Sequence, residues 1–190
     1  MRHYPRTLFT PAVRAAQERY GSRAMGERLE NDTRDDGQLG PAETAFIEER
    51  DGFYLATVNE EGWPYVQFRG GAPGFLKVLD PGRLAFADLR GNRQYISVGN
   101  LSADGRVSLF LMDYAERRRL KLLARATVHE AEEAPELAEQ VVDEATARGT
   151  ERIIVLEVVG FDWNCPQHIT PRWTAEEWRA RDLEDPASPS

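Results

Sequence analysis

Basic and amide side chains recur between short apolar runs from Phe53 to Val128, and their types suit a phosphorylated, planar ligand. Arginine makes paired, charge-assisted hydrogen bonds to phosphate, and amides can satisfy the polar edge of a ring. In a chain with 24 Lys and Arg, any one of the basic residues alone is more readily a surface charge than a ligand contact. Their joint placement after consecutive strands favours a binding site. The residues are Gln67, Arg69, Lys77, Asn92, Arg93, Gln94 and Arg119.

Three local patterns refine this expectation. The segment 92–101 is predicted to be a short helix, so that Arg93 and Gln94 stand at its start, where free N–H groups and the helix dipole favour phosphate. The loop 69–74, RGGAPG, either lets the backbone approach a ring closely through Gly70 or is a simple crossover connection. The tail after the last strand is dense in aromatic and polar residues, and it either closes the barrel or reaches a ligand. These tail residues include Trp163, Asn164, Gln167, His168 and Arg172.

The elements that must position these side chains are mainly strands. Alternating apolar patterns and turn residues predict strands at 53–58, 64–69, 75–80, 83–88, 106–113, 119–128 and 152–163. Helices are expected at 10–20, 41–50, 92–101, 134–148 and 174–182, while 27–40 is expected to be irregular. Six to seven strands with few intervening helices favour a mainly β fold, an antiparallel barrel with flanking helices. The expected organisation is an N-terminal arm and helix at 1–40, the barrel at 41–163 and a C-terminal tail at 164–190.

Composition limits the possible functions. The net charge of −8 argues against broad nucleic-acid binding and against anionic membranes. No apolar run approaches the roughly 20 residues needed to span a bilayer. A single cysteine, Cys165, excludes an internal disulfide. The three histidines lack metal-ligand spacing, so no metal site is predicted. The cytoplasm is the expected location.

The arrangement GWPYVQ, LKVLD, FADLRGNRQY and then NL with a basic-aliphatic strand resembles the pyridoxamine 5′-phosphate oxidase-related family of FMN-binding split barrels. The resemblance implies FMN at a homodimer interface. It places Lys77 near the flavin edge, Ala87 and Asp88 where the family has a Tyr-Thr pair, and Arg93 at the phosphate. Gln94 stands in place of a lysine, and Arg119 in place of a flavin-contacting glutamine. The tail PQHITPRW differs in order from the Arg-x-His segment that binds pyridoxamine phosphate.

The resulting hypothesis is an FMN-dependent oxidoreductase that acts on a small molecule, with NAD(P)H as a candidate electron donor. The flavin carries such chemistry, so no catalytic side chain is named. The alternative is a non-catalytic module that binds or senses flavin, F420 or haem. A partner-binding barrel without a cofactor is a third hypothesis.

Overall fold

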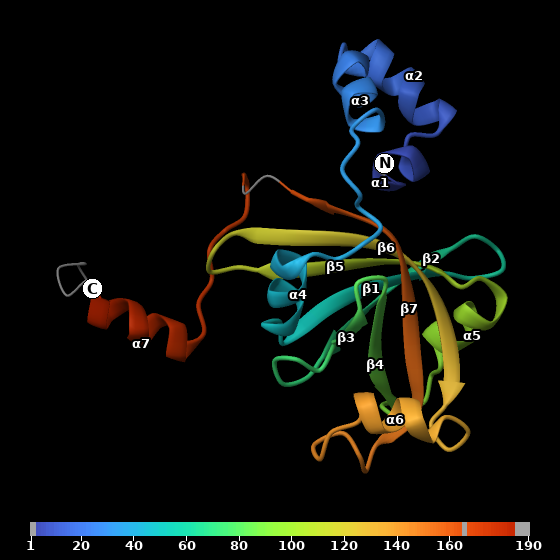
Figure 1. The fold of residues 1–190 in the computed structure, drawn as a ribbon, viewed down its shortest axis with the longest axis vertical. Coiled ribbons are helices and arrows are strands. Elements are labelled where there is room, and N and C mark those ends of the chain that lie inside the picture. The colour runs from blue at the N-terminus through green and yellow to red at the C-terminus, as the bar shows by residue number, and fades with distance from the viewer. Residues whose placement is uncertain (1–2, 165–166, 185–190) are drawn as a thin grey trace.

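The computed structural model describes residues 3–164 and 167–184, so Cys165 and the end of the predicted tail lie outside the described residues. Its centre is one seven-stranded antiparallel sheet in the order β2-β1-β5-β6-β7-β4-β3 (Figure 1). The strands are β1 (Gly52–Val58), β2 (Pro64–Gly70), β3 (Lys77–Asp80), β4 (Arg83–Leu89), β5 (Arg106–Asp113), β6 (Arg118–Glu130) and β7 (Thr150–Trp163). The helices are α1 (His3–Leu8), α2 (Pro11–Arg19), α3 (Arg23–Glu30), α4 (Pro41–Glu48), α5 (Ile96–Ala103), α6 (Pro135–Val141) and α7 (Ala175–Glu184). The prediction of a mainly β, antiparallel split barrel with flanking helices is confirmed.

The core fills the inner side of the curved sheet. Successive side chains of a strand point to opposite faces, so alternate residues are buried. Phe53 and Leu55 on β1 and Leu109 on β5 are at most 1% exposed. Helix α4 closes one end with Phe46 and Ile47, which are equally buried. Strands β2 and β3 stand at the two ends of the strand order, so the sheet is not closed by pairing between them.

The predicted helix at 92–101 starts too early. Helix α5 begins at Ile96, because Arg93 and Tyr95 have φ angles of 60° and 52°, which are left-handed and incompatible with a right-handed helix. The Asn92 side chain also accepts the Gln94 N–H at 3.1 Å, in place of a helical bond. Arg93 therefore lies in the connection before the helix.

Two further boundaries differ from prediction. Helix α6 ends at Val141 rather than continuing to Arg148, because Asp143 and Thr146 exchange side-chain and backbone hydrogen bonds and form a separate turn. The segment 27–40, expected to be irregular, contains the end of α3. Glu30 anchors this helix by an ion pair of 2.6 Å with Arg14.

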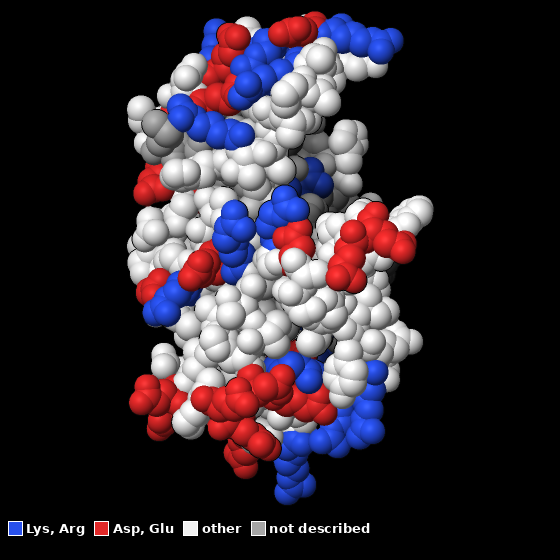
Figure 2. Space-filling view, turned by 90° about the vertical axis from the view of Figure 1, so that its right-hand side faces the viewer, with Lys and Arg blue, Asp and Glu red and all other residues white. Residues whose placement is uncertain are grey.

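Helices α1 to α3 lie together above the sheet, and α7 lies to one side of it (Figure 1). Helix α1 contacts β7 at Gly160, where an added Cβ would lie 2.8 Å from the Tyr4 nitrogen. Within the described residues no helix is long and apolar enough to cross a membrane. On the face shown in Figure 2, Lys and Arg alternate with Asp and Glu rather than forming one basic surface.

Candidate functional site

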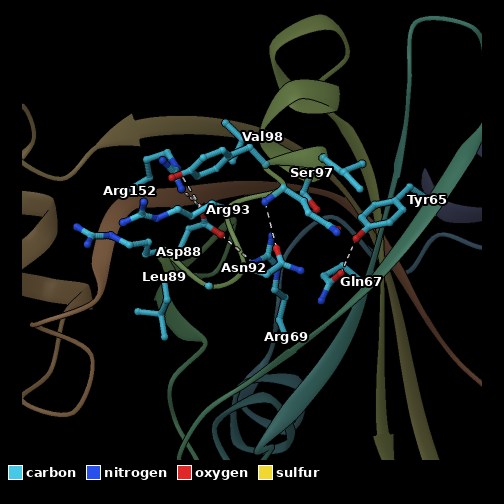
Figure 3. Close-up of a pocket in the computed structure, with 15 residues that line it drawn as sticks. Tyr65, Gln67, Arg69, Asp88, Leu89, Asn92, Arg93, Ser97, Val98 and Arg152 are labelled. Carbon is cyan, nitrogen blue, oxygen red and sulfur yellow. Dashed lines mark hydrogen bonds and ion pairs between the residues drawn. The ribbon is translucent and has the colours of Figure 1, made fainter.

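A cavity of about 200 Å³ lies where β2, the end of β4, the start of α5 and the start of β7 meet. We call it the arginine cavity. Figure 3 shows side chains of β2 on one side and those of β4 and β7 on the other. Its lining residues are Tyr65, Gln67, Arg69, Asp88, Leu89, Arg90, Gly91, Asn92, Arg93, Gln94, Tyr95, Ile96, Ser97, Val98 and Arg152.

Strand β2 supplies the first wall by simple alternation. Tyr65, Gln67 and Arg69 are half-buried, while the residues between them are exposed. The Tyr65 hydroxyl donates to Gln67 Oε1 at 2.6 Å, which orients the amide. Arg69 donates through Nη1 to Asp88 Oδ1 at 2.8 Å, and its Nε is buried without a hydrogen-bond partner among the described residues. The Arg69 side chain therefore retains donor capacity toward a ligand.

A buried ion pair between Asp88 and Arg152 holds Arg69 in place through Asp88. Asp88 on β4 and Arg152 on β7 are paired in the strand register and are 2% and 7% exposed. Asp88 Oδ2 accepts from Arg152 Nε at 3.0 Å and Nη2 at 2.9 Å. Burial lowers the pKa of Arg152, but hydrogen bonds and charge attraction from Asp88 outweigh it and leave this pKa raised. Arg152 is thus a structural cation, and Arg69 is the guanidinium that remains available.

The connection between β4 and α5 supplies the second wall. Its positive φ angles at Gly91, Arg93 and Tyr95 turn the chain sharply above the cavity. Tyr95 is the N-cap of α5 and makes no side-chain cap hydrogen bond within the described part of the chain. Ile96, Ser97 and Val98, the first residues of α5, line the cavity, and the free N–H groups of a helix N-terminus favour an anion.

The charge balance gives the cavity its chemical preference. Four arginines and one aspartate line it, in a chain whose net charge is −8. A concentration of cations on an otherwise acidic protein attracts a small anion to this place. The donors present, guanidinium and backbone N–H groups, are those that bind phosphate.

A second cavity of about 180 Å³ shares Arg69, Leu89 and Gly91 with the first. Three phenylalanines contribute to it, and we call it the aromatic cavity. Its other residues are Phe68, Gly70, Gly71, Phe75, Phe86, Ala87, Val141, Asp143 and Thr146. An arginine-lined space beside an aromatic one has the chemistry that suits a ligand with a phosphate at one end and a planar ring at the other.

In the 69–74 loop, aromatic rings of the chain occupy the space beside Gly70 and Gly71. An added Cβ at Gly70 would lie 2.8 Å from the Phe68 ring, and one at Gly71 would lie 2.7 Å from Phe75. These rings pack over glycine because only glycine leaves room for them. Gly70 still borders the aromatic cavity, and its contact with a flavin stays a prediction.

The structure brings most of the predicted site residues together. Gln67, Arg69, Asp88, Asn92, Arg93 and Gln94 line the arginine cavity, and Gly70 and Ala87 line its neighbour. Lys77 borders a separate cavity with Leu79 and Gln140. Hydrogen bonds from Thr146 lower the pKa of Asp143 most, and the charge of Lys77 lowers it further.

The remaining predicted residues lie elsewhere in the chain. Arg119 and His168 border another cavity, of about 400 Å³, on the outer face of β1 and β5. Trp163 packs edge-on against Phe46 at 4.8 Å and donates its indole N–H to Glu43 at 2.7 Å, so it joins β7 to α4. Gln167 is exposed. Within one chain these four residues line neither the arginine cavity nor the aromatic cavity.

Sequence reasoning missed the other nine lining residues of the arginine cavity, which include the polar side chains of Tyr65, Arg90, Tyr95, Ser97 and Arg152. Tyr65 was detectable, because it alternates with Gln67 and Arg69 on one strand. Arg152 was not, since its place depends on β7 pairing with β4.

Fold and site together define a split β-barrel protein with an arginine-lined cavity at the end of β4. The sequence profile described as pyridoxamine 5′-phosphate oxidase matches residues 39–162, and the chain belongs to this family. No curated protein matches the sequence.

Two solved structures with TM-scores above 0.5 share the fold. A candidate pyridoxamine 5′-phosphate oxidase from Lactobacillus delbrueckii is 22% identical, with a TM-score of 0.53 over 67% of this chain and 96% of that one. HupZ from Group A Streptococcus is 12% identical, with a TM-score of 0.51 over 71% and 99%. HutZ, the haem storage protein of Vibrio cholerae, is 18% identical, with a TM-score of 0.45 over 66% and 94%.

Proposed function

We propose that the protein is a homodimeric, cytoplasmic FMN-binding oxidoreductase that acts on a small molecule. The observation that carries this proposal is that the arginine cavity and the aromatic cavity are neighbours that share Arg69, Leu89 and Gly91 as lining residues. Arg69 and Arg93 would hold the phosphate, with the N-terminus of α5 adding backbone donors. When bound, the flavin supplies the electron transfer, and NAD(P)H is a candidate donor.

This chain's residues would bind and orient the cofactor. The Phe68 and Phe75 rings, which border the aromatic cavity, offer flat apolar surface beside a planar ring. The Gln67 amide, oriented by Tyr65, can hydrogen-bond a polar edge of the ligand. Membership of the family supports the same assignment of Arg93 to the phosphate.

An exposed apolar surface supports the homodimer. Tyr54, Val66 and Phe68 are 39%, 59% and 54% exposed and share the outer face of β1 and β2, as their register shows. A second copy on this face would cover it, and twofold dimers are the commonest oligomers. It would also give a flavin access to Arg119 and His168 of the neighbouring copy, which border the cavity on the outer face of β1 and β5.

The alternative function is a non-catalytic module for flavin, F420 or haem. In the described ranges 3–164 and 167–184, neither of the two neighbouring cavities is lined by histidine, cysteine or methionine, three common axial ligands of haem. Tyrosine, a fourth axial ligand, is present as Tyr65 and Tyr95, whose hydroxyls hydrogen-bond to Gln67 and Glu151. This favours a phosphate-bearing flavin or deazaflavin over haem.

Absorbance and turnover test the proposal. The purified protein, loaded with FMN, is expected to show flavin bands, to melt at a higher temperature than the unloaded protein, and to oxidise NAD(P)H with a suitable acceptor. Flavin bands without turnover would support the non-catalytic module. A colourless protein whose melting temperature FMN does not raise would refute FMN binding.

A further inference from the structure

One carboxylate ties both ends of the connection between β4 and α5. Glu151 on β7 accepts from Arg90 Nε at 2.8 Å at the start of this connection and from the Tyr95 hydroxyl at 3.1 Å at its end. Arg152 Nη1 lies 3.0 Å from the same carboxylate. The segment between these ties, residues 91–94, is exposed and includes Arg93 and Gln94.

The connection needs such a restraint because its backbone is strained. Arg93 and Tyr95 are non-glycine residues with φ angles of 60° and 52°. Left-handed conformations of this kind are unfavourable for non-glycine residues and persist only where the surroundings impose them. Apart from Glu151, Tyr95 is held by the Arg152 guanidinium, whose Cζ lies 4.9 Å from the ring centroid.

We propose that Glu151 is a positioning residue, which holds the β4–α5 connection in the conformation that presents Arg93 and the N-terminus of α5 to a ligand phosphate. The proposal rests on the function proposed above and deepens it. Glu151 is not among the residues that line the arginine cavity, so it acts through Arg90, Tyr95 and Arg152. Its hydrogen bond with Arg90, and then those with Tyr95 and Arg152, keep the pKa of the Glu151 carboxyl below its usual value despite desolvation.

A purely electrostatic role for Glu151 and a positioning role predict opposite changes in FMN affinity when its charge is removed. The carboxylate lies close to three groups around a cationic cavity, and its negative charge repels phosphate. If Glu151 only contributed charge, Glu151→Gln would bind FMN more tightly than the wild type. If Glu151 positions the connection, the same variant binds FMN more weakly, since the amide cannot replace the charge-assisted hydrogen bonds.

The test compares FMN and riboflavin affinities of the full chain in the wild type and three variants. Glu151→Gln is expected to weaken FMN binding about tenfold and to leave riboflavin, which lacks the phosphate, unchanged. Tyr95→Phe keeps every charge and loses one hydroxyl, so it should weaken FMN binding in the same direction but less. Glu157→Gln is the control, because Glu157 is an exposed acid on the same strand, opposite Arg83.

A second readout does not depend on the ligand. Amide hydrogen exchange over residues 91–96 of the unloaded protein should be faster in Glu151→Gln than in the wild type or in Glu157→Gln, with the sheet unchanged. FMN affinity in Glu151→Gln that equals or exceeds the wild-type value would overturn the proposal. If no form binds FMN, the proposed function fails, and unchanged exchange at 91–96 would separately refute the positioning role.

Discussion

The buried ion pair between Asp88 and Arg152 gives a sharp prediction about stability. Replacing Arg152 by methionine puts a long apolar side chain in its place and removes both hydrogen bonds to Asp88 Oδ2, of 2.9 and 3.0 Å. Asp88 is 2% exposed, so water cannot replace the lost partner. Only Arg69, at 2.8 Å from Oδ1, still compensates the carboxylate.

Breaking a buried ion pair by removing one partner costs about 3–5 kcal/mol. Because Arg69 remains, we expect Arg152→Met to lie at the lower end, about 3 kcal/mol. With a urea slope of ~2 kcal/mol per M, the unfolding midpoint should fall by about 1.5 M. Asp88→Asn should also destabilise the fold, and the double variant should cost less than the sum of the two single ones by about 1–3 kcal/mol.

Urea unfolding at one fixed protein concentration measures these midpoints, since a dimer makes stability depend on concentration. Arg83→Met is the control, because Arg83 forms an ion pair with Asp80 in the same sheet, but the two side chains are 54% and 40% exposed. Such a pair contributes about 0–1 kcal/mol. If Arg152→Met unfolds at the same midpoint as Arg83→Met, or if the double variant is additive, the Asp88–Arg152 pair does not stabilise the fold as described.

Three further predictions follow from individual contacts. Arg93→Ala should weaken FMN binding about 10–150-fold and spare riboflavin, because it loses a charge-assisted phosphate contact; equal FMN dissociation constants would exclude this role. Trp163→Phe should lower stability by about 1–2 kcal/mol in thermal unfolding, since Glu43 loses its indole donor; an unchanged melting temperature would contradict this. Burial, and then the charge of Asp162, raise the pKa of Tyr4 from 10.0 to about 12. The neutral Tyr4 hydroxyl therefore contributes to stability fully below pH 10, and this contribution is lost as the pH rises toward 12. The Tyr4→Phe variant should not lose stability in this pH range through Tyr4, so identical alkaline unfolding profiles of variant and wild type would refute the prediction.

Local patterns were sufficient to predict the strands and part of the site. Residues 83–94 form β4 and then the cavity wall in direct succession, so the local pattern identified Asn92 and Arg93, while Asp88 came from the family resemblance. The conformation of this segment was not predicted, because the apolar spacing at 92–101 indicated a helix and gave no sign of the left-handed residues Arg93 and Tyr95. Glycine usually marks such backbone, and only Gly91 gave that signal here.

The supporting shell of the cavity could not be predicted from sequence. Glu151 and Arg152 are far from Asp88 and Tyr95 along the chain, and they meet only because β7 pairs with β4 in one particular register. A shift by one residue would turn Arg152 to the other face of the sheet. For Arg119 and Trp163 the sequence predicted a ligand contact that a single chain does not show. The family resemblance assigns Arg119 to a ligand, and the density of aromatic and polar residues in the tail assigns Trp163 to it, while their contacts within one chain lie elsewhere.

The most direct test of FMN binding at the arginine cavity is a parallel titration of the unloaded wild-type protein with FMN and with riboflavin, followed by flavin fluorescence. The account predicts saturable binding of one FMN per chain and an affinity for riboflavin at least about tenfold weaker, the difference expected for one lost charge-assisted contact. Equal affinities would show that the arginines do not hold the phosphate, and absence of FMN binding would contradict the central claim.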